Sequence, residues 1–525
     1  LQLVDTATLS LDATGLVNVW QVEESVVIAG NTYQIGDLNL ADIAAVGNVT
    51  MGAGTLASMA TGLAPSGTAA INVEKIASTG SVTLLAASGI YDAFDDLNNA
   101  IINVRSVDLH LHSGGEIGSP SATNPNYLDI KISGAVSASA IGNVYLNAVE
   151  SHLLVANIES TSDVYLKASQ SILDSENDNA FQDISLVGNS DIKADSIYLN
   201  ALKGAIGQFG NQLEIDTDAA NGGQLTSYSF LDTYLRETTG DLNLANMTAD
   251  SDNQGAADSD IYLVVDQSLY NTASSGVNLN ADKVRIITGA DIGAAVGVGT
   301  PITSQINYLE ARSDTGAINW ENTGHLQLGS VSDLLSGVSA AGNINIMANS
   351  PLTVLEHILS NTGDISLSAA DSAASATDIL TVASTAQVTA LQGNVTLNAG
   401  DELMLAQGAK LSANASIILN TDLGSADSEA ASVALFGQIQ ASDIYINTGI
   451  ANDSVLLDVE QLDGDTYVKT GEGDDLITIN QLHSRADVLR IDGEAGSDSY
   501  VINRTAANAD YAIDVLDTGA PDSGA

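Results

Sequence analysis

The chain has 525 residues, with 15 lysines and arginines against 65 aspartates and glutamates, which gives a net charge of −50. Binding to nucleic acid or to anionic lipid headgroups depends on cationic side chains that displace counterions, so this charge excludes both as partners. The absence of cysteine excludes disulfides, thiolate metal sites and a thiol nucleophile. Hydrophobic residues make up 45% of the chain, which predicts a folded core rather than disorder. No apolar run approaches the roughly 18 residues that span a bilayer, so membrane insertion is not expected.

One short phrase recurs along the chain: Gly or Ser, then Asn, Asp or Ser, then aliphatic, any residue and aliphatic. The first two positions are typical of a turn, and the alternation that follows is typical of a short strand with its aliphatic side chains on one face. Copies of the phrase lie at 80–84, 142–146, 162–166, 240–244, 259–263, 342–346, 363–367, 393–397 and 442–446.

The spacing of the phrase predicts the fold class. Gly142 and Ser162 begin neighbouring copies 20 residues apart (162 − 142), and Gly363 and Gly393 begin copies 30 residues apart (393 − 363). Short strands at this spacing, without amphipathic helices between them, indicate a solenoid. Aromatic residues are only 4% of the chain, and a thin coil filled by Ala, Val, Ile and Leu needs few of them. We therefore expect an all-β protein, a right-handed parallel β-helix with loop insertions.

We expect three regions: N-terminal coils over 1–75, a repetitive β-helix over 75–450, and C-terminal coils over 451–525. In the middle region an Ile-Gly pair recurs at Gly118, Gly207 and Gly293, which are 89 and 86 residues apart (207 − 118 and 293 − 207). This spacing predicts a super-repeat of about 88 residues. The strand after each pair is expected at 127–130, 212–215 and 306–309.

Three segments are expected outside the coils. Residues 92–100 form the best short candidate for a helix and are placed on a loop excursion. The acidic segments 174–179 and 251–260 are predicted to be loops that protrude from the coils, because solenoid edges tolerate insertions.

The segments 363–370 and 393–400 are similar to coils of filamentous-haemagglutinin-like giant exoproteins of Gram-negative bacteria, and the resemblance covers about 75–450. It implies a right-handed parallel β-helix that serves as a surface stalk or adhesin and is secreted. The chain departs from that family because the secretion domain of the two-partner type is not recognisable in it. The route of secretion is therefore left open.

The C-terminal region contains two turns that resemble the calcium-binding nonapeptide of RTX proteins. Gly471-Glu472-Gly473-Asp474-Asp475 fits its Gly-x-Gly-x-Asp core, and Asp492-Gly493-Glu494-Ala495-Gly496-Ser497-Asp498 is similar, with Glu494 in place of a glycine. Glycines allow a tight turn in which carbonyls and carboxylates converge on a hard cation. Asp475 and Asp498 are separated by about one coil, so they are expected to stack and hold one calcium ion between them. The alternative is that both are acidic turns without an ion. The predicted metal-site residues are Gly471, Gly473, Asp474, Asp475, Asp492, Gly493, Gly496 and Asp498.

Two further sets of side chains are candidate sites. His110 and His112 share one strand face, as two metal ligands would, but no third ligand is evident and a solvated strand face is the preferred interpretation. Tyrosines occupy the outward position of the phrase and form either a cross-coil ladder or an aromatic strip that binds carbohydrate. These tyrosines are Tyr145, Tyr165, Tyr198, Tyr262 and Tyr445.

The expected function is mechanical and not enzymatic. Polysaccharide-degrading β-helices combine acids with bases on one face, whereas the seven arginines and eight lysines of this chain are dispersed. We therefore expect an extracellular or cell-surface rod of a bacterial adhesin or fibre, stabilised by calcium and able to self-associate. Its partners would be further copies of itself and a glycan or protein receptor on a host or cell surface. A polysaccharide-degrading enzyme and a carbohydrate-binding module that uses the tyrosines are the alternatives.

Overall fold

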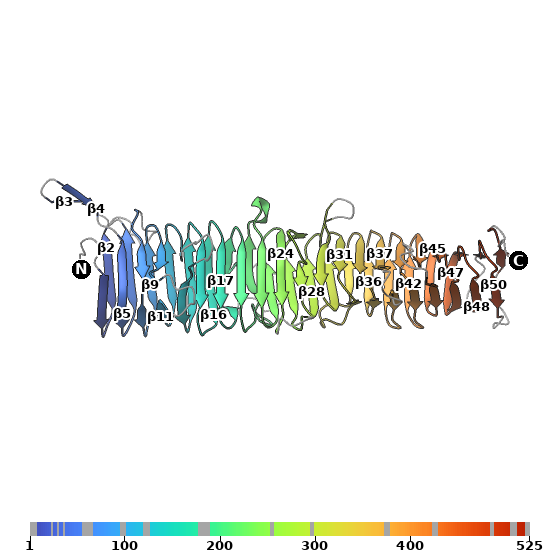
Figure 1. Ribbon diagram of the computed structural model, residues 1–525, viewed down its shortest axis with the longest axis horizontal. Helices are drawn as coiled ribbons and strands as arrows, with labels where there is room; N and C mark the ends of the chain where they lie inside the picture. The colour runs from blue at the N-terminus through green and yellow to red at the C-terminus, as the bar shows by residue number, and fades with distance from the viewer. Residues whose placement is uncertain are drawn as a thin grey trace. The chain divides into compact units, whose positions relative to one another are not determined.

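A computed structural model describes most of the chain, namely residues 8–22, 25–28, 31–34, 37–54, 67–94, 101–118, 126–176, 189–251, 257–294, 299–371, 378–422, 429–482, 488–503 and 512–519. Two compact units make up the chain, Leu1–Asp266 and Gln267–Ala525. Both are built almost wholly from short strands (Figure 1).

The first unit contains these strands and one short 3-10 helix: β1 (Thr8–Ala13), β2 (Val17–Val22), β3 (Ser25–Ile28), β4 (Asn31–Gln34), β5 (Leu38–Ala45), β6 (Val49–Gly54), β7 (Ile71–Val73), β8 (Ile76–Ser78), β9 (Val82–Ala86), β10 (Ile90–Asp92), β11 (Val104–Ser106), β12 (Leu109–Ser113), β13 (Leu128–Ile132), β14 (Ala135–Ala140), β15 (Val144–Ala148), β16 (Leu153–Ser160), β17 (Val164–Ala168), β18 (Ile172–Asp174), β19 (Ile192–Ala194), β20 (Ile197–Ala201), β21 (Leu213–Thr217), η1 (Ala219–Asn221), β22 (Leu225–Ser229), β23 (Thr233–Glu237), β24 (Leu242–Ala249) and β25 (Ile261–Val265).

The second unit contains the strands β26 (Leu269–Asn271), β27 (Leu279–Asn280), β28 (Lys283–Thr288), β29 (Ile302–Gln305), β30 (Tyr308–Ser313), β31 (Ile318–Asn322), β32 (Leu326–Leu328), β33 (Val338–Ala340), β34 (Ile344–Ala348), β35 (Leu352–Val354), β36 (His357–Ser360), β37 (Ile365–Ala369), β38 (Ile379–Val382), β39 (Gln387–Ala390), β40 (Val395–Asn398), β41 (Glu402–Leu405), β42 (Lys410–Ala413), β43 (Ser416–Asn420), β44 (Ser432–Leu435), β45 (Gln438–Asn447), β46 (Ser454–Val459), β47 (Gln461–Lys469), β48 (Leu476–Leu482), β49 (Leu489–Asp492), β50 (Ser499–Ile502) and β51 (Ile513–Leu516).

Most strands pair in parallel with one that lies two or three places further along the chain, and β1 and β2 pair with β5 and β6. In the first unit β12 pairs with β14 and β15 with β17, two places on, whereas β17 pairs with β20, three places on. In the second unit β34 pairs with β37 and β37 with β40, three places on, whereas β44 pairs with β46, two places on. An antiparallel hairpin, β3 with β4, is separate from these ladders (Figure 1). The prediction of an all-β parallel β-helix is confirmed.

The recurring phrase marks one strand position on successive coils. Val144 pairs with Val164, and Ile365 pairs with Val395, so the step from one copy of the phrase to the next equals the length of a coil. The aliphatic positions lie inside: Val144, Val164 and Val395 are all 0% exposed. Fully burying such a side chain stabilises a fold by roughly 1.5–3 kcal/mol, and the repetition of this burial builds the core.

The Asn or Asp of the phrase stabilises the join between coils. In the first unit Asp163 N donates to Asn143 Oδ1 at 3.1 Å, and Ser196 N donates to Asp163 Oδ1 at 3.1 Å. In the second unit Asn394 N donates to Asp364 Oδ1 at 2.8 Å. Each such side chain therefore accepts the main-chain N–H of the next coil just before its strand begins, which explains why an acceptor recurs there.

The Ile-Gly pairs have one conformation. Gly118, Gly207 and Gly293 have φ of 75°, 64° and 71°, a left-handed region that favours glycine. The N–H groups of Gly118 and Gly207 donate to Ile90 O and Ile172 O, and that of Gly293 to Leu269 O. The super-repeat is thus a repeat of backbone geometry. Of the strand expected at 306–309, only Tyr308 and Leu309 lie in a strand, β30 (Tyr308–Ser313). Its alignment with the earlier repeats was wrong, because β29 (Ile302–Gln305) takes the place that β13 and β21 take there.

The structure agrees only in part with the predicted loop segments. Asp92 ends β10 and Asp174 ends β18, and both side chains are buried, so neither residue belongs to a protruding loop as predicted. Each aspartate is the last residue of its strand, because the buried aliphatic residue that begins the strand still belongs to the coil. The rest of these segments lies largely outside the described residues, at 95–100 and 177–188. In the segment 251–260, Ser251 N donates to Asp258 Oδ1 at 2.8 Å, and 252–256 lie outside the described residues.

Candidate metal centre

The two Gly-Asp turns predicted to bind calcium stack on adjacent coils of the second unit. Glu472 forms a parallel bridge with Ala495, and Gly473 N donates to Ala495 O at 2.7 Å. Gly471 must be glycine here, because its φ is 93° and a Cβ would lie 1.9 Å from Gly449 O. Gly496 has a φ of 149°, and a Cβ there would clash with Gly473 O of the other turn, so this glycine allows the two turns to stack closely.

Asp475 and Asp498 stack as the sequence predicts, in a column of carboxylates that runs from coil to coil. Asp475 N donates to Asp498 Oδ1 at 3.0 Å, and Asp453 N donates to Asp475 Oδ1 at 2.8 Å. Ala431 N donates in turn to Asp453 Oδ1 at 2.8 Å. We name Asp453, Asp475 and Asp498 the aspartate column. In it, one oxygen of each carboxylate accepts the N–H of the preceding coil.

The other oxygens of this column are the groups that a cation would use. Asp475 Oδ2 and Asp498 Oδ2 are buried and have no hydrogen-bond partner among the described residues. Burial, together with the nearby charges of Asp453 and Asp498, raises the pKa of Asp475. The oxygens that the RTX-like turns present thus fit a hard cation in type, and calcium binding there stays a prediction.

The other predicted acids of these turns serve the backbone. Asp474 Oδ1 accepts a hydrogen bond from Ser497 N at 2.9 Å. Asp492, which is buried, accepts hydrogen bonds from Thr518 N at 3.1 Å and from the Thr518 hydroxyl at 2.7 Å. Burial opposes ionisation of Asp492, but the hydrogen bonds from Thr518 and from Glu494 N outweigh it and lower the pKa of Asp492. The next residue, Gly493, donates its N–H to the Tyr500 hydroxyl at 2.9 Å.

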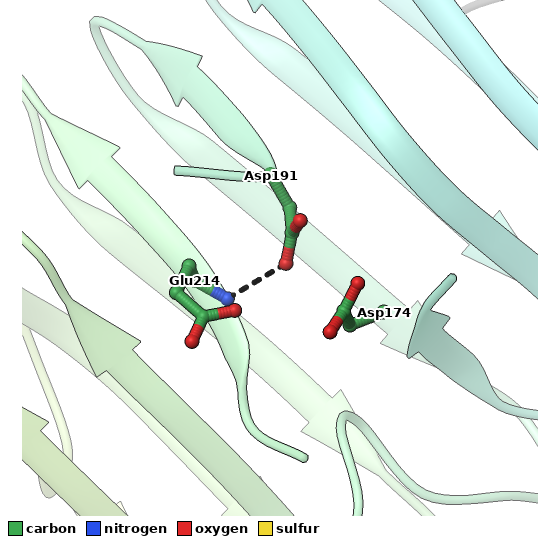
Figure 2. Close-up of side chains that lie close together, drawn as sticks. All are labelled: Asp174, Asp191 and Glu214. Atoms are coloured by element: carbon green, nitrogen blue, oxygen red, sulfur yellow. Dashed lines mark hydrogen bonds between the residues drawn. The ribbon is translucent and has the colours of Figure 1, made fainter. Parts of the chain in front are cut away.

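A different set of acids comes closest together in the part of the chain that the structure describes. Asp174, Asp191 and Glu214 each offer a carboxylate oxygen, and these oxygens lie within 4.8 Å of one another. They are 6%, 6% and 1% exposed. Figure 2 shows the three carboxyl groups pointing toward one another. We name Asp174, Asp191 and Glu214 the acidic cluster, and among the described residues it is the one group of three such ligands this close.

Three strands of the first unit position the acidic cluster. Asp174 is the last residue of β18, Asp191 directly precedes β19, and Glu214 is the second residue of β21. The pairing of Ile192 with Ile215 places Asp191 beside Glu214, and Glu214 N donates to Asp191 Oδ2 at 3.0 Å (Figure 2). Sequence reasoning missed this cluster because Asp174 was assigned to a protruding loop and the three acids share no motif.

Two further buried ionisable residues lie on β23, which pairs with the strand of Glu214. Arg236 is the register partner of Glu214 and is 4% exposed. Glu237 is 0% exposed and accepts hydrogen bonds from Thr217 N at 2.9 Å and from the Thr217 hydroxyl at 3.1 Å. Burial raises the pKa of Glu237 well above its usual range.

The two histidines share the outer face of β12, as expected. His110 is exposed and His112 is partly exposed, while Leu109 and Leu111 are buried. No third metal ligand joins them among the described residues.

The tyrosines form stacks across coils, which confirms the predicted ladder. Ring centroids are 4.6 Å apart for Tyr145 and Tyr165, 4.3 Å for Tyr165 and Tyr198, and 5.3 Å for Tyr445 and Tyr467. Tyr145, expected to point outward, is only 5% exposed, because its neighbours in the stack cover it. The rings cover one another's faces, so within a stack a sugar would meet ring edges.

The cationic residues are less dispersed than the sequence indicates. Arg105 and Lys131 are register partners on β11 and β13, and Lys131 Nζ lies 2.8 Å from Glu150 Oε2. Together with His152 they line one hollow of the first unit. The hydrogen bond and charge of Lys131 lower the pKa of Glu150, whose φ is 58°. This group is a local ion pair on stacked strands, which sequence distance conceals.

No family model, curated protein or solved structure matches the chain. The similarity to a β-solenoid therefore rests on the strand ladders alone, and no family is identified. Within the described residues there is no helix of the length and hydrophobicity that crossing a membrane requires.

Proposed function

We propose that this chain is a structural segment of a secreted or cell-surface bacterial fibre or adhesin, and that it is not an enzyme. The observation that supports the proposal is the in-register repetition of one strand position. In the second unit this position passes from Ile344 to Ile365, Val395, Ile417 and Ile444. Each coil buries its aliphatic side chains against the next, and such one-dimensional stacking suits a protein that spans distance and presents loops.

The proposal includes calcium at the RTX-like turns, self-association and a receptor. Oxygens of Asp475 and Asp498 that accept no hydrogen bond from the described residues support the calcium site. Stacked coils extend by adding strands, so a second copy is a natural partner for end-to-end association. A glycan or protein on a cell surface is the receptor that an adhesin of this kind would bind, whereas nucleic acid and membranes are disfavoured by the charge of −50.

Electron microscopy of the purified chain tests the structural role. We expect elongated particles of uniform width that resist limited proteolysis, because the inner strands of the described ladders are paired on both sides. Compact globules, or digestion throughout the coils at low protease concentration, would contradict the proposal. Addition of millimolar calcium is expected to raise the melting temperature, and the variant D475N/D498N is expected to lose the part of that rise that comes from the turns.

A further inference from the structure

The coil segment that contains the acidic cluster occurs three times in the chain. The glycine of each Ile-Gly pair donates to the first residue of β10, β18 or β26, and strand pairing then aligns the segments that follow. We name these segments the first, second and third copies. In the order of the copies, the equivalent residues are Asp92, Asp174 and Asn271, then Asn103, Asp191 and Asn278, then Asp129, Glu214 and Thr303.

In the first and third copies the central residue is an asparagine that joins its two neighbours. Asn103 Nδ2 donates to Asp92 Oδ1 at 2.6 Å, and Asn278 Nδ2 donates to Asn271 Oδ1 at 3.0 Å. The oxygens of these asparagines accept the N–H of the next coil, from Asp129 at 2.8 Å and from Thr303 at 3.0 Å. The central side chain is therefore a donor on one side and an acceptor on the other.

The second copy keeps the acceptor and replaces the donor by an oxygen. Asp191 Oδ2 accepts Glu214 N at 3.0 Å, the same bond that the asparagines make. Because a carboxylate has the shape of an amide, Asp191 Oδ1 takes the place of the amide nitrogen that faces Asp92 or Asn271. An ionised carboxylate has no proton to donate, so Asp191 presents an oxygen where the other copies present an N–H.

The acidic cluster holds more negative than positive charge among the described residues. Its three buried carboxylates stand against the one buried guanidinium of Arg236, the register partner of Glu214. The sequence between Asp174 and Asp191 contains no lysine, arginine or histidine. Bringing three carboxylates together in a buried place is costly, and a divalent cation shared by their oxygens would lower that cost.

Further oxygens adjoin the acidic cluster. Asn211 is 4% exposed, and its Nδ2 donates to Asp174 O at 3.5 Å, so its side-chain amide lies against the cluster. Asn211 Oδ1 is buried and has no hydrogen-bond partner among the described residues. In the first copy, Asn103 Nδ2 also contacts the carbonyl oxygens of Val73 and Glu74 of the preceding coil, at 3.0 and 3.3 Å.

Register places two carbonyls in the second copy where the first copy has those of Val73 and Glu74. Val73 pairs with Asp92 and Val155 pairs with Asp174, so Val155 and Ala156 are their equivalents. The register thus brings main-chain carbonyl oxygens, together with the carboxylates, to the place where the other copies have the N–H donor. Such an all-oxygen, irregular environment suits calcium, which takes six to eight oxygens, better than magnesium, which demands an octahedron.

We propose that Asp174, Asp191 and Glu214 bind one divalent cation of the calcium type, which joins three successive strands of the first unit. The site is separate from the RTX-like turns and does not depend on the proposed function. It follows from the replacement of an asparagine donor by Asp191 between two buried acids.

The variant D191N tests the site directly, because it restores the residue that both other copies carry. The full chain, stripped with EDTA, is titrated with calcium by equilibrium dialysis in the D475N/D498N background, which removes the turns as a source of binding. We expect D191N to bind one ion per chain fewer than its parent. Hydrogen exchange of the peptides that contain β19 and β21 is expected to slow with calcium in the parent and to be unchanged by calcium in D191N.

The variant E214Q provides a second route, since it removes a ligand charge while keeping the N–H that bonds Asp191. It is expected to lower calcium affinity at the same site at least tenfold. Equal stoichiometry in D191N and its parent, or exchange in β19 that ignores calcium, would overturn the proposal. So would exchange that depends on pH but not on calcium and loses that dependence in D191N, because the acids would then share protons instead of a cation. Magnesium, tested in the same way, is expected to bind more weakly.

Discussion

The aspartate column of the second unit and the acidic cluster of the first unit are both buried sets of carboxylates, yet their hydrogen bonds differ. In the column, Asp453 and Asp475 are each 2% exposed, and each gives one oxygen to a main-chain N–H of the preceding coil. In the acidic cluster the carboxylates meet side by side on three strands, and the one bond drawn among them is from Glu214 N to Asp191 (Figure 2).

This difference shows that the hydrogen-bond partners of a buried acid depend on whether the acids are repeated along the stack of coils or gathered at one place. Acids repeated along the stack find an N–H in every coil, so a column is stabilised by the backbone itself. Acids gathered around one place compete for the same few donors, and their charges add. A buried acid therefore has a structural role in the aspartate column, whereas in the acidic cluster it is a proposed cation ligand.

The largest expected effect comes from making the first copy like the second. The substitution N103D places a third acid between Asp92 and Asp129 and removes the N–H that Asp92 accepts at 2.6 Å. The free energy of unfolding in EDTA should fall by about 3–5 kcal/mol, because an uncompensated charge is buried. Calcium should recover part of the loss, measured by denaturant unfolding followed by circular dichroism.

The matched control for N103D is N361D, which adds the same charge at an exposed turn of the second unit. It should change the free energy of unfolding by less than about 0.5 kcal/mol. If N103D lowered the free energy of unfolding no more than N361D, the amide of Asn103 would not be the group that stabilises Asp92 and Asp129 beside each other.

A smaller effect is expected when the aspartate column is broken. The substitution D475A leaves Asp453 N, which donates to Asp475 Oδ1 at 2.8 Å, without its acceptor. A buried N–H left unpaired costs about 1–3 kcal/mol. D475N retains an oxygen at this place and should cost less, in EDTA, by the same denaturant measurement. Equal losses in the two variants would show that the charge of Asp475, and not its role as acceptor, stabilises the column.

Glu237 is a third kind of buried acid, one whose two carboxylate oxygens both accept hydrogen bonds from Thr217. Burial raises its pKa in the folded state, so its contribution to stability is complete below the pKa of the unfolded chain and is lost as pH rises through the folded pKa. The free energy of unfolding should therefore decrease with rising pH in the wild type, and less steeply in E237Q. Unfolding between pH 5 and 8 would show this, with E159Q on an exposed position of β16 as the control.

The smallest effect is expected at the ion pair between Lys193 and Asp216, beside the acidic cluster. The Lys193 side chain is 61% exposed and that of Asp216 is 14% exposed, so solvent screens much of their attraction. K193Q should lower the free energy of unfolding by less than about 1 kcal/mol. A loss as large as that of N103D would mean that exposed and buried charges near this cluster act as one network.

The sequence predicted the coils well because their signal is local and repeated. The phrase that contains Val144 and Val164 combines a turn, an acceptor and two buried aliphatics in one short stretch, and each part has one physical role. The stacking of Asp475 on Asp498 was predicted for the same reason, since their separation equals one coil.

The acidic cluster was not predicted because its signal lies between copies of the super-repeat. Asp191 is informative only when it is compared with Asn103 and Asn278, and that comparison needs the correct alignment of the third copy. The predicted strand at 306–309 gave a wrong alignment there. Asp174 was assigned to a loop because acidic segments are usually solvated, whereas the pairing of Val155 with Asp174 keeps it in the coil.

The hydrogen bonds of the phrase have a polarity that bears on how the chain assembles in time. Asn143 accepts from Asp163, and Asp163 accepts from Ser196, so the acceptor belongs to the earlier coil. A chain that emerges from its N-terminal end would meet a finished template at each step. In the aspartate column the acceptor belongs to the later coil, so Asp453 N is satisfied only after Asp475 has been added. The hydrogen bonds of the phrase would therefore favour the addition of coils in chain order, whereas those of the aspartate column would stabilise a coil only after the next one has been added.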